Sequence, residues 1–157
     1  MTTAFGSFTS QVLTAADLNT AGGSWTTFTP SFTNFTLGNG TIDRAAYEQI
    51  GRSVDVFVRV TLGSTSSVSG VITLTLPVTA LSTSAYGSAS FYDTSATTFY
   101  RGGIQGSTTT AVRLVALNAS ATYLTETNTS STVPMTWATG DIFVAWVRYE
   151  EIGRAHV

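Results

Sequence analysis

The feature that most constrains the fold is an apolar residue at every second position from 54 to 62. These residues are Val54, Val56, Val58, Val60 and Leu62. Successive side chains of a β-strand point to opposite faces of a sheet, so this period predicts a strand with one face in a core. Gly51 and Arg52 separate this strand from the segment 41–50, and glycine favours a tight turn there because it adopts positive φ readily. The sequence therefore predicts a β-hairpin at the centre of an all-β domain.

Further segments of strand-like composition follow at intervals of about ten residues, with turn residues between them. They are 71–76, 84–92, 97–104, 109–117 and 142–149, with a shorter candidate at 122–125. This pattern predicts an antiparallel β-sandwich of the jelly-roll type over residues 24–150. The last segment is apolar on both faces, which predicts a strand in the centre of the sandwich or at a subunit interface.

Residues 1–23 are interpreted as an N-terminal arm. The run Thr14-Ala15-Ala16-Asp17 fits a capping box, and Gly22 and Gly23 favour a stop after it, so the arm is expected to contain a short helix. One or two helical turns are marginal in water without a packing partner. We expect the arm to attach the domain to another protein; a helix that closes one end of the sandwich is the alternative.

The last seven residues, 151–157, resemble the translation of a common sequencing-library adapter, GAG ATC GGA AGA GCA CAC GTC. The next adapter codon is the stop TGA, and the sequence ends after Val157. We therefore interpret this heptapeptide as an artefactual tail rather than part of the domain. It includes His156, the sole histidine of the chain, so no role is expected for that residue.

Composition argues against several classes of function. Charged residues make up 10% of the chain, against about 25% in a typical globular domain. The net charge is −2, and every basic residue is arginine, so no basic footprint for nucleic acid is expected. Cysteine is absent, and no apolar run approaches the roughly 18 residues of a membrane span. We expect no disulfide, no nucleic-acid partner and no insertion into a membrane.

Four short motifs recur in one order along the chain: WTTFTP at 25–30, LGNGT at 37–41, YEQIGRSV at 47–54 and LPV at 76–78. With the segment LTAADLN at 13–19, they resemble the C-terminal modules of tail-fibre and minor tail proteins of actinobacterial phages. The resemblance covers residues 13–149. The sequence of 157 residues is short for that family, in which a long shaft or large tail domain often precedes such modules.

The resemblance implies a jelly-roll module that forms homotrimers, similar in architecture to C1q/TNF-type heads. It also implies a virion location, on the phage tail or capsid surface, where residues 1–23 contact other virion proteins. We therefore expect a non-enzymatic tail-fibre knob, receptor-binding module or decoration protein. A free carbohydrate-binding domain without a virion role is the alternative.

Catalytic and metal chemistry have little support in the sequence. With His156 set aside, no side chain has an ordinary pKa near neutrality. Asp43 and Asp55 could meet across the central hairpin as a glycosidase pair, but a charge cluster with Arg44 and Arg59 fits them better. No spacing of acidic residues resembles a calcium loop. We expect no enzyme activity, no metal and no cofactor.

Two sets of residues are candidate contact sites. Aromatic and polar residues that could contact a host surface glycan are Tyr86, Tyr92, Phe99, Tyr100, Arg101 and Tyr123. Packing inside the domain or between subunits is the alternative for these rings. The candidate trimer interface is Ile142, Val144 and Trp146, on one face of the last strand, because a closed trimer would bury that face around its axis.

Overall fold

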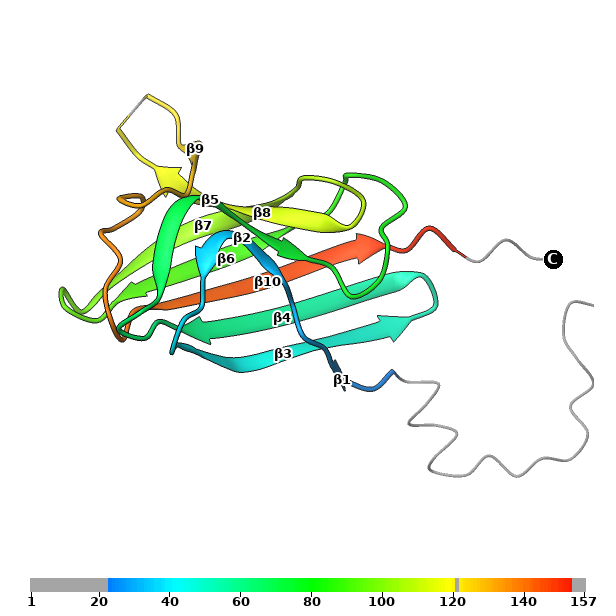
Figure 1. The fold of residues 1–157 in the computed structure, drawn as a ribbon. Helices are drawn as coiled ribbons and strands as arrows, with labels where there is room; N and C mark the ends of the chain where they lie inside the picture. The colour runs from blue at the N-terminus through cyan, green and yellow to red at the C-terminus, as the bar shows by residue number, and fades with distance from the viewer. Residues whose placement is uncertain (1–22, 121, 154–157) are drawn as a thin grey trace, which may run out of the picture.

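The computed structural model describes residues 23–120 and 122–153, and every regular element in this part of the chain is a β-strand (Figure 1). The strands are β1 (Thr26–Thr27), β2 (Phe32–Thr36), β3 (Thr41–Ile50), β4 (Ser53–Thr61), β5 (Ser67–Thr75), β6 (Tyr86–Asp93), β7 (Thr98–Gly106), β8 (Ala111–Asn118), β9 (Thr125–Asn128) and β10 (Ile142–Glu150). The prediction of an all-β domain is confirmed. The expected N-terminal helix, like most of the arm, lies outside the described residues. Within them, no helix is long and apolar enough to cross a membrane.

The strands form one antiparallel sheet in the order β1-β3-β4-β10-β6-β7-β8-β5-β2, and β9 pairs with β8. β1 and β2 lie at opposite ends of this order, yet only residues 28–31 connect them. The sheet must therefore curl until its two end strands approach each other, as Figure 1 shows for β2 above β3 and β4.

The central hairpin is formed by β3 and β4, as predicted. Ile50 lies opposite Ser53, and Gly51 between them has φ of 60°, the conformation that favours glycine. Alternate residues of β4 are buried to 1% exposure or less, at Val54, Val56, Val58 and Val60. The apolar period in the sequence thus marks the side of β4 that faces the core.

The curled sheet encloses a core in which aromatic rings from an inner strand and from one end strand meet. The ring of Phe143 on β10 lies 5.2 Å from that of Phe35 and 6.0 Å from that of Phe32, both on β2, in edge-to-face geometry. Ile72 and Leu74 of β5 are also fully buried in this cluster. The concave side of the sheet is therefore a filled hydrophobic core rather than an open cavity.

β10 lies between β4 and β6 and is therefore an inner strand of the sheet. One side of β10 is buried in the core, as expected for one of its two apolar faces. This side carries Phe143, Ala145, Val147 and Tyr149. The opposite side carries Ile142, Val144 and Trp146, which the single chain leaves partly or fully exposed. Among the described residues, no second layer covers this side of β10, so burial of both sides within one chain is not seen there. The alternative arrangement, a subunit interface on this side, stays a prediction.

A second hairpin is formed by β7 and β8, in the region of the segments expected at 97–104 and 109–117, and its strands pair from Gly102–Ala116 to Gly106–Val112. β6, in the segment expected at 84–92, approaches the backbone of β10 closely at Gly87, where a Cβ would lie 1.9 Å from the carbonyl oxygen of Trp146. The short strand expected at 122–125 is instead β9, three residues further along the chain.

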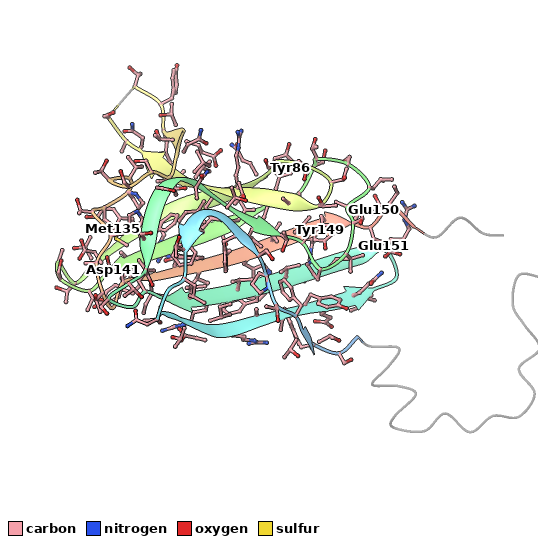
Figure 2. All side chains as sticks on the ribbon, viewed as in Figure 1. Tyr86, Met135, Asp141, Tyr149, Glu150 and Glu151 are labelled. Atoms are coloured by element: carbon pink, nitrogen blue, oxygen red, sulfur yellow. The ribbon has the colours of Figure 1, made fainter. Side chains whose placement is uncertain are left out.

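Along the strand direction, the domain has two ends, and different turns and loops lie at each. At one end, which we call the hairpin end, the β3–β4 turn lies beside the first and last described residues: Gly23 approaches Glu48, and Glu151 donates its N–H to the carbonyl of Arg52 at 2.8 Å. The opposite end is called the loop end. There the N–H of Thr65 donates to Asn39 Oδ1, and Leu62, just after β4, exchanges backbone hydrogen bonds with Gly140 and Asp141. Figure 2 shows Asp141 and Glu151 at these two opposite ends.

Candidate binding face on the outer side of the sheet

We use the term outer face for the side chains of β3, β4, β10, β6 and β7 that point away from the core. The row nearest the loop end runs from Thr61 on β4 through Ile142 and Tyr92 to Phe99 on β7. The rings of Tyr92 and Phe99 stack with their centroids 4.5 Å apart and their planes at 35°. Phe99 is nevertheless 63% exposed, so one side of this aromatic pair is open to solvent.

The next row of the outer face carries three arginines. Arg44, Arg59, Val144, Ser90 and Arg101 lie opposite one another in this order across β3, β4, β10, β6 and β7. Arg101 donates from Nη1 to Ser90 Oγ at 3.4 Å. Like charges directly opposite on neighbouring strands repel, so the adjacent pair Arg44 and Arg59 requires compensation from other groups.

A cavity of about 220 Å³ opens between these two rows. Its lining residues are Arg59, Ser90, Tyr92, Phe99, Ile142 and Val144. The cavity is mainly apolar, with the guanidinium of Arg59 and the hydroxyl of Ser90 at its polar side. This combination suits a ring-shaped ligand that carries at least one acceptor group.

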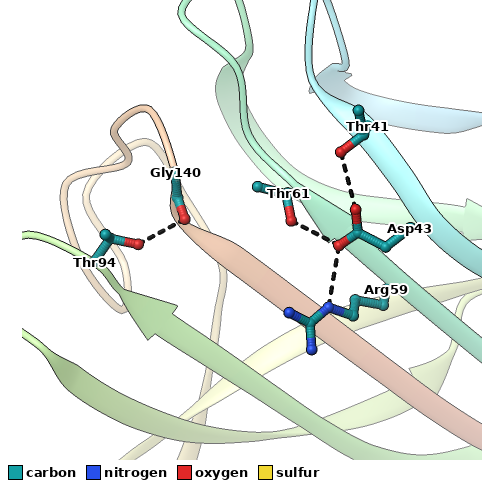
Figure 3. Close-up of polar contacts among 6 residues, drawn as sticks. All are labelled: Thr41, Asp43, Arg59, Thr61, Thr94 and Gly140. Carbon is teal, nitrogen blue, oxygen red and sulfur yellow. Dashed lines mark hydrogen bonds and ion pairs between the residues drawn. The ribbon is translucent and has the colours of Figure 1, made fainter.

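Asp43 compensates the charge of Arg59 (Figure 3). Its Oδ2 accepts hydrogen bonds from Arg59 Nε at 3.1 Å and Thr61 Oγ1 at 2.6 Å, and its Oδ1 accepts one from Thr41 at 3.0 Å. Partial burial alone would raise the pKa of Asp43, but these hydrogen bonds outweigh it and hold the pKa below its usual value. Asp43 therefore stays ionised and fixes the guanidinium of Arg59 through one nitrogen.

An aromatic patch, formed by Trp25, Phe57 and Trp146, lies next to the arginine row toward the hairpin end. The ring of Trp146 meets those of Trp25 and Phe57 edge to face, with centroids 6.3 and 5.7 Å away. The guanidinium carbon of Arg44 lies 4.9 Å from the Trp25 ring and 5.1 Å from the Phe57 ring, within cation–π distance. Trp25 and Trp146 are 39% and 47% exposed, so the patch presents aromatic surface to solvent.

The predicted charge cluster of the central hairpin is only partly present. Asp43 pairs with Arg59, but Asp55 pairs with Arg148 of β10 and lies opposite Glu48 rather than Asp43. The two aspartates belong to different rows, so they do not form the close carboxylate pair considered for a glycosidase. Within the described residues, no group of three or more His, Cys, Asp or Glu side chains is placed to hold a metal ion.

The six candidate glycan contacts are divided between four places. Tyr92, Phe99 and Arg101 lie together at or beside the cavity, and Tyr86 is on the same face at the hairpin end. Tyr100 points to the opposite side of β7, where it packs against the core and lines a second cavity of about 280 Å³. Tyr123 is 81% exposed in the loop between β8 and β9.

The three candidate trimer residues lie on the same face as the glycan candidates. Ile142 and Val144 line the cavity, and Trp146 belongs to the aromatic patch. Sequence reasoning overlooked Arg59, Ser90, Trp25 and Phe57 as members of this face. In the sequence, three of these residues stand on the polar side of a strand and Trp25 stands just before one. The strand pairings that bring them together join distant segments, so the sequence alone does not reveal the common face.

Comparison of the chain with protein-family profiles, with curated proteins and with solved structures finds no match.

Proposed function

We propose that the protein is a non-enzymatic module of a phage virion that assembles as a homotrimer, as a tail-fibre knob, receptor-binding module or decoration protein. The proposed architecture is a jelly-roll-like sandwich, which the curled antiparallel sheet and the enclosed core support. Residues 1–23 are the proposed attachment to other virion proteins on the tail or capsid surface. The ordered motifs at 25–30, 37–41, 47–54 and 76–78 support the phage assignment.

The observation that carries the homotrimer is the aromatic patch around Trp146. A central strand that turns Trp146 and its neighbour Val144 outward presents apolar surface where a monomer would place polar residues. Contiguous exposed apolar surface marks interaction sites. The low share of charged residues, 10%, favours an oligomer in which copies of this chain cover part of one another's surface. Three copies that bury Trp25, Phe57 and Trp146 around one axis would form a closed assembly.

The polarity of the domain supports attachment at the hairpin end. Gly23, the first described residue, lies at this end beside Glu48 and Ile50. The cavity lies near the loop end, on the row of Ile142. A virion contact at residues 1–23 would therefore leave the cavity directed away from the particle.

The solution mass of the full chain, measured by light scattering, tests this proposal. We expect a trimer for the wild type and a monomer or aggregate for Trp146→Asp, because a buried unpaired carboxylate is not tolerated at an interface. Leu81→Asp is the matched control, since Leu81 is 45% exposed in the loop between β5 and β6. A monomeric wild type, or a trimeric Trp146→Asp protein, would contradict the proposal.

A carbohydrate-binding domain is the second candidate function, and the cavity beside Tyr92 and Phe99 favours it. Stacked, half-open aromatic rings beside arginine and serine donors are suited to sugar binding. A glycan array probed with the wild type and Phe99→Ala tests this function. Deletion of residues 1–23 separates the readings further: it should abolish decoration of a particle and leave sugar binding intact.

A further inference from the structure

The cavity on the outer face contains an arginine whose two terminal nitrogens have no hydrogen-bond partner among the described residues. Arg59 uses only Nε toward Asp43, and its side chain is 47% exposed. Figure 3 shows the remaining two nitrogens turned away from Asp43. An arginine held by one nitrogen presents the other two as a fixed fork, which matches the two oxygens of a carboxylate.

The charge around the cavity is positive although the whole chain is acidic. Arg44, Arg59 and Arg101 share one row across the sheet, and among the residues that the structure describes Asp43 is the one carboxylate that pairs with them. Arg44 is directed to the rings of the aromatic patch, and Arg101 contacts Ser90. Repulsion along such a row is relieved when an anion binds beside Arg59, so the row favours an acidic ligand.

The apolar walls define the rest of the ligand. Phe99 lines the cavity from β7 with a ring that is 63% exposed, and Arg59 lines it from β4, with β10 and β6 between them. Ile142 and Val144 of β10 form the apolar wall between these two residues. At about 220 Å³, the space is smaller than the roughly 300 Å³ at which drug-sized pockets begin, so it suits a single small ring. A sugar ring can lay its C–H face on Phe99 while a substituent reaches Arg59.

We propose that this cavity binds a carboxylate-bearing sugar, a glycuronate, with the carboxylate on the terminal nitrogens of Arg59 and the sugar ring on Phe99. This inference rests on the second candidate function, carbohydrate binding, and names the sugar class for it. It is compatible with a trimer whose subunits meet at the aromatic patch, which lies on the hairpin side of the cavity. In that arrangement Ile142 and Val144, which are also candidate trimer residues, form the cavity wall and only Trp146 of the three lies in the interface.

The test compares two sugars that differ only at the carboxylate. The full-length protein is titrated with methyl β-D-glucuronide and with methyl β-D-glucoside, and binding is followed by amide chemical shifts. We expect the glucuronide to bind at least about tenfold more tightly, the usual effect of a hydrogen-bonded charged pair. Glucose 6-phosphate serves as a third probe, and tighter binding of it than of the glucuronide would overturn the assignment of a carboxylate.

Three variants locate the site. Arg59→Gln should weaken glucuronide binding about tenfold or more and leave glucoside binding unchanged. Phe99→Ala, at a largely exposed ring, should weaken both sugars. Arg52→Gln is the matched control, because Arg52 pairs with Glu150 at the hairpin end and has the same charge change. Melting curves for each variant establish that the fold is intact, and Phe99→Ala keeps the site testable where Arg59→Gln unfolds.

The outcomes separate this inference from the function on which it rests. Equal affinity for the two sugars would overturn the glycuronate assignment and leave carbohydrate binding standing. Absence of binding for both sugars and the phosphate would overturn the inference, and a glycan array then tests carbohydrate binding independently. An equal loss from Arg52→Gln and Arg59→Gln would show that net charge, not the cavity, attracts the sugar.

Discussion

Asp55 and Arg148 are 93 residues apart in the chain and lie directly opposite each other on β4 and β10. Arg148 donates from Nε to Oδ1 and from Nη2 to Oδ2 of Asp55, each at 2.8 Å. On the other side of β4, Asp55 lies opposite a second acid, Glu48. Arg148 therefore neutralises a carboxylate that would otherwise meet only a like charge across the sheet, and this contact raises the pKa of Arg148.

Replacement of Arg148 should expose that repulsion. We expect Arg148→Met to lower the urea midpoint of unfolding at neutral pH, and the loss to shrink at high salt, where repulsion between Asp55 and Glu48 is screened. Arg52→Met is the control, because its pair with Glu150 is exposed on both sides, with relative exposures of 52% and 54%. Equal shifts of the urea midpoint for both variants would contradict a specific role for the bidentate contact between Arg148 and Asp55.

Asp141 is a fully buried carboxylate whose oxygens both accept backbone hydrogen bonds. Oδ1 accepts from the N–H of Thr94 at 2.9 Å and Oδ2 from the N–H of Ala138 at 2.7 Å. Asp141→Ala should lower the free energy of unfolding by about 1–3 kcal/mol, because it leaves these N–H groups without a partner. Chemical denaturation measures the change, and Glu150→Ala, at an exposed carboxylate, should give a smaller one.

Two phenylalanines provide a matched test of the core. Phe143 is fully buried and meets the rings of Phe32, Phe35 and Trp137, whereas Phe99 is 63% exposed. Phe143→Ala should lower the free energy of unfolding by about 3–5 kcal/mol, the range for loss of a buried ring. Phe99→Ala should change it by about 0.5 kcal/mol or less. A large loss from Phe99→Ala would contradict the description of the cavity wall as open.

Tyr149 should make stability fall at alkaline pH. Burial raises the pKa of its phenol above the ordinary value of 10.0, so the unfolded chain loses this proton at lower pH than the folded chain. The contribution of Tyr149 is thus complete below pH 10 and decreases as the pH rises beyond it. Tyr149→Phe should lose less stability than the wild type between about pH 9 and pH 11, as followed by urea midpoints.

The same substitution has a second, pH-independent effect. The Tyr149 hydroxyl donates to the carbonyl of Val78 at 2.8 Å. Removal of that hydrogen bond should cost about 0.5–1.5 kcal/mol at neutral pH. A flat alkaline profile in the wild type would contradict the assigned burial of the phenol.

The sequence predicts those parts of the fold in which one local period dominates. Alternation from Val54 to Val60 predicted both β4 and its buried side, and Gly51 predicted the turn before it. β10 is apolar at nearly every position, so its sequence predicts a strand but not which side faces the core. The side with Phe143 is covered by β2, a contact between segments more than a hundred residues apart.

The candidate site was less predictable because adjacent aromatic residues point in opposite directions. Phe99 faces the cavity and Tyr100 faces the core, and only the parity of β7 in the sheet decides between them. Arg59 joins Val144 through a pairing of β4 with β10 that no local pattern encodes. A single sequence supplies residue types and local periods, but the register between distant strands follows from the packed core.

The inner position of β10, the last strand in the described part of the chain, has a consequence for synthesis of the protein. β4 and β6 each pair with β10, so both keep an unpaired backbone edge until residues 142–150 leave the ribosome. Unpaired edges are templates for aggregation, and such long-range pairings form slowly. A ribosome that stops before Ile142 would release a chain in two open halves, so truncated products should be insoluble rather than partly folded.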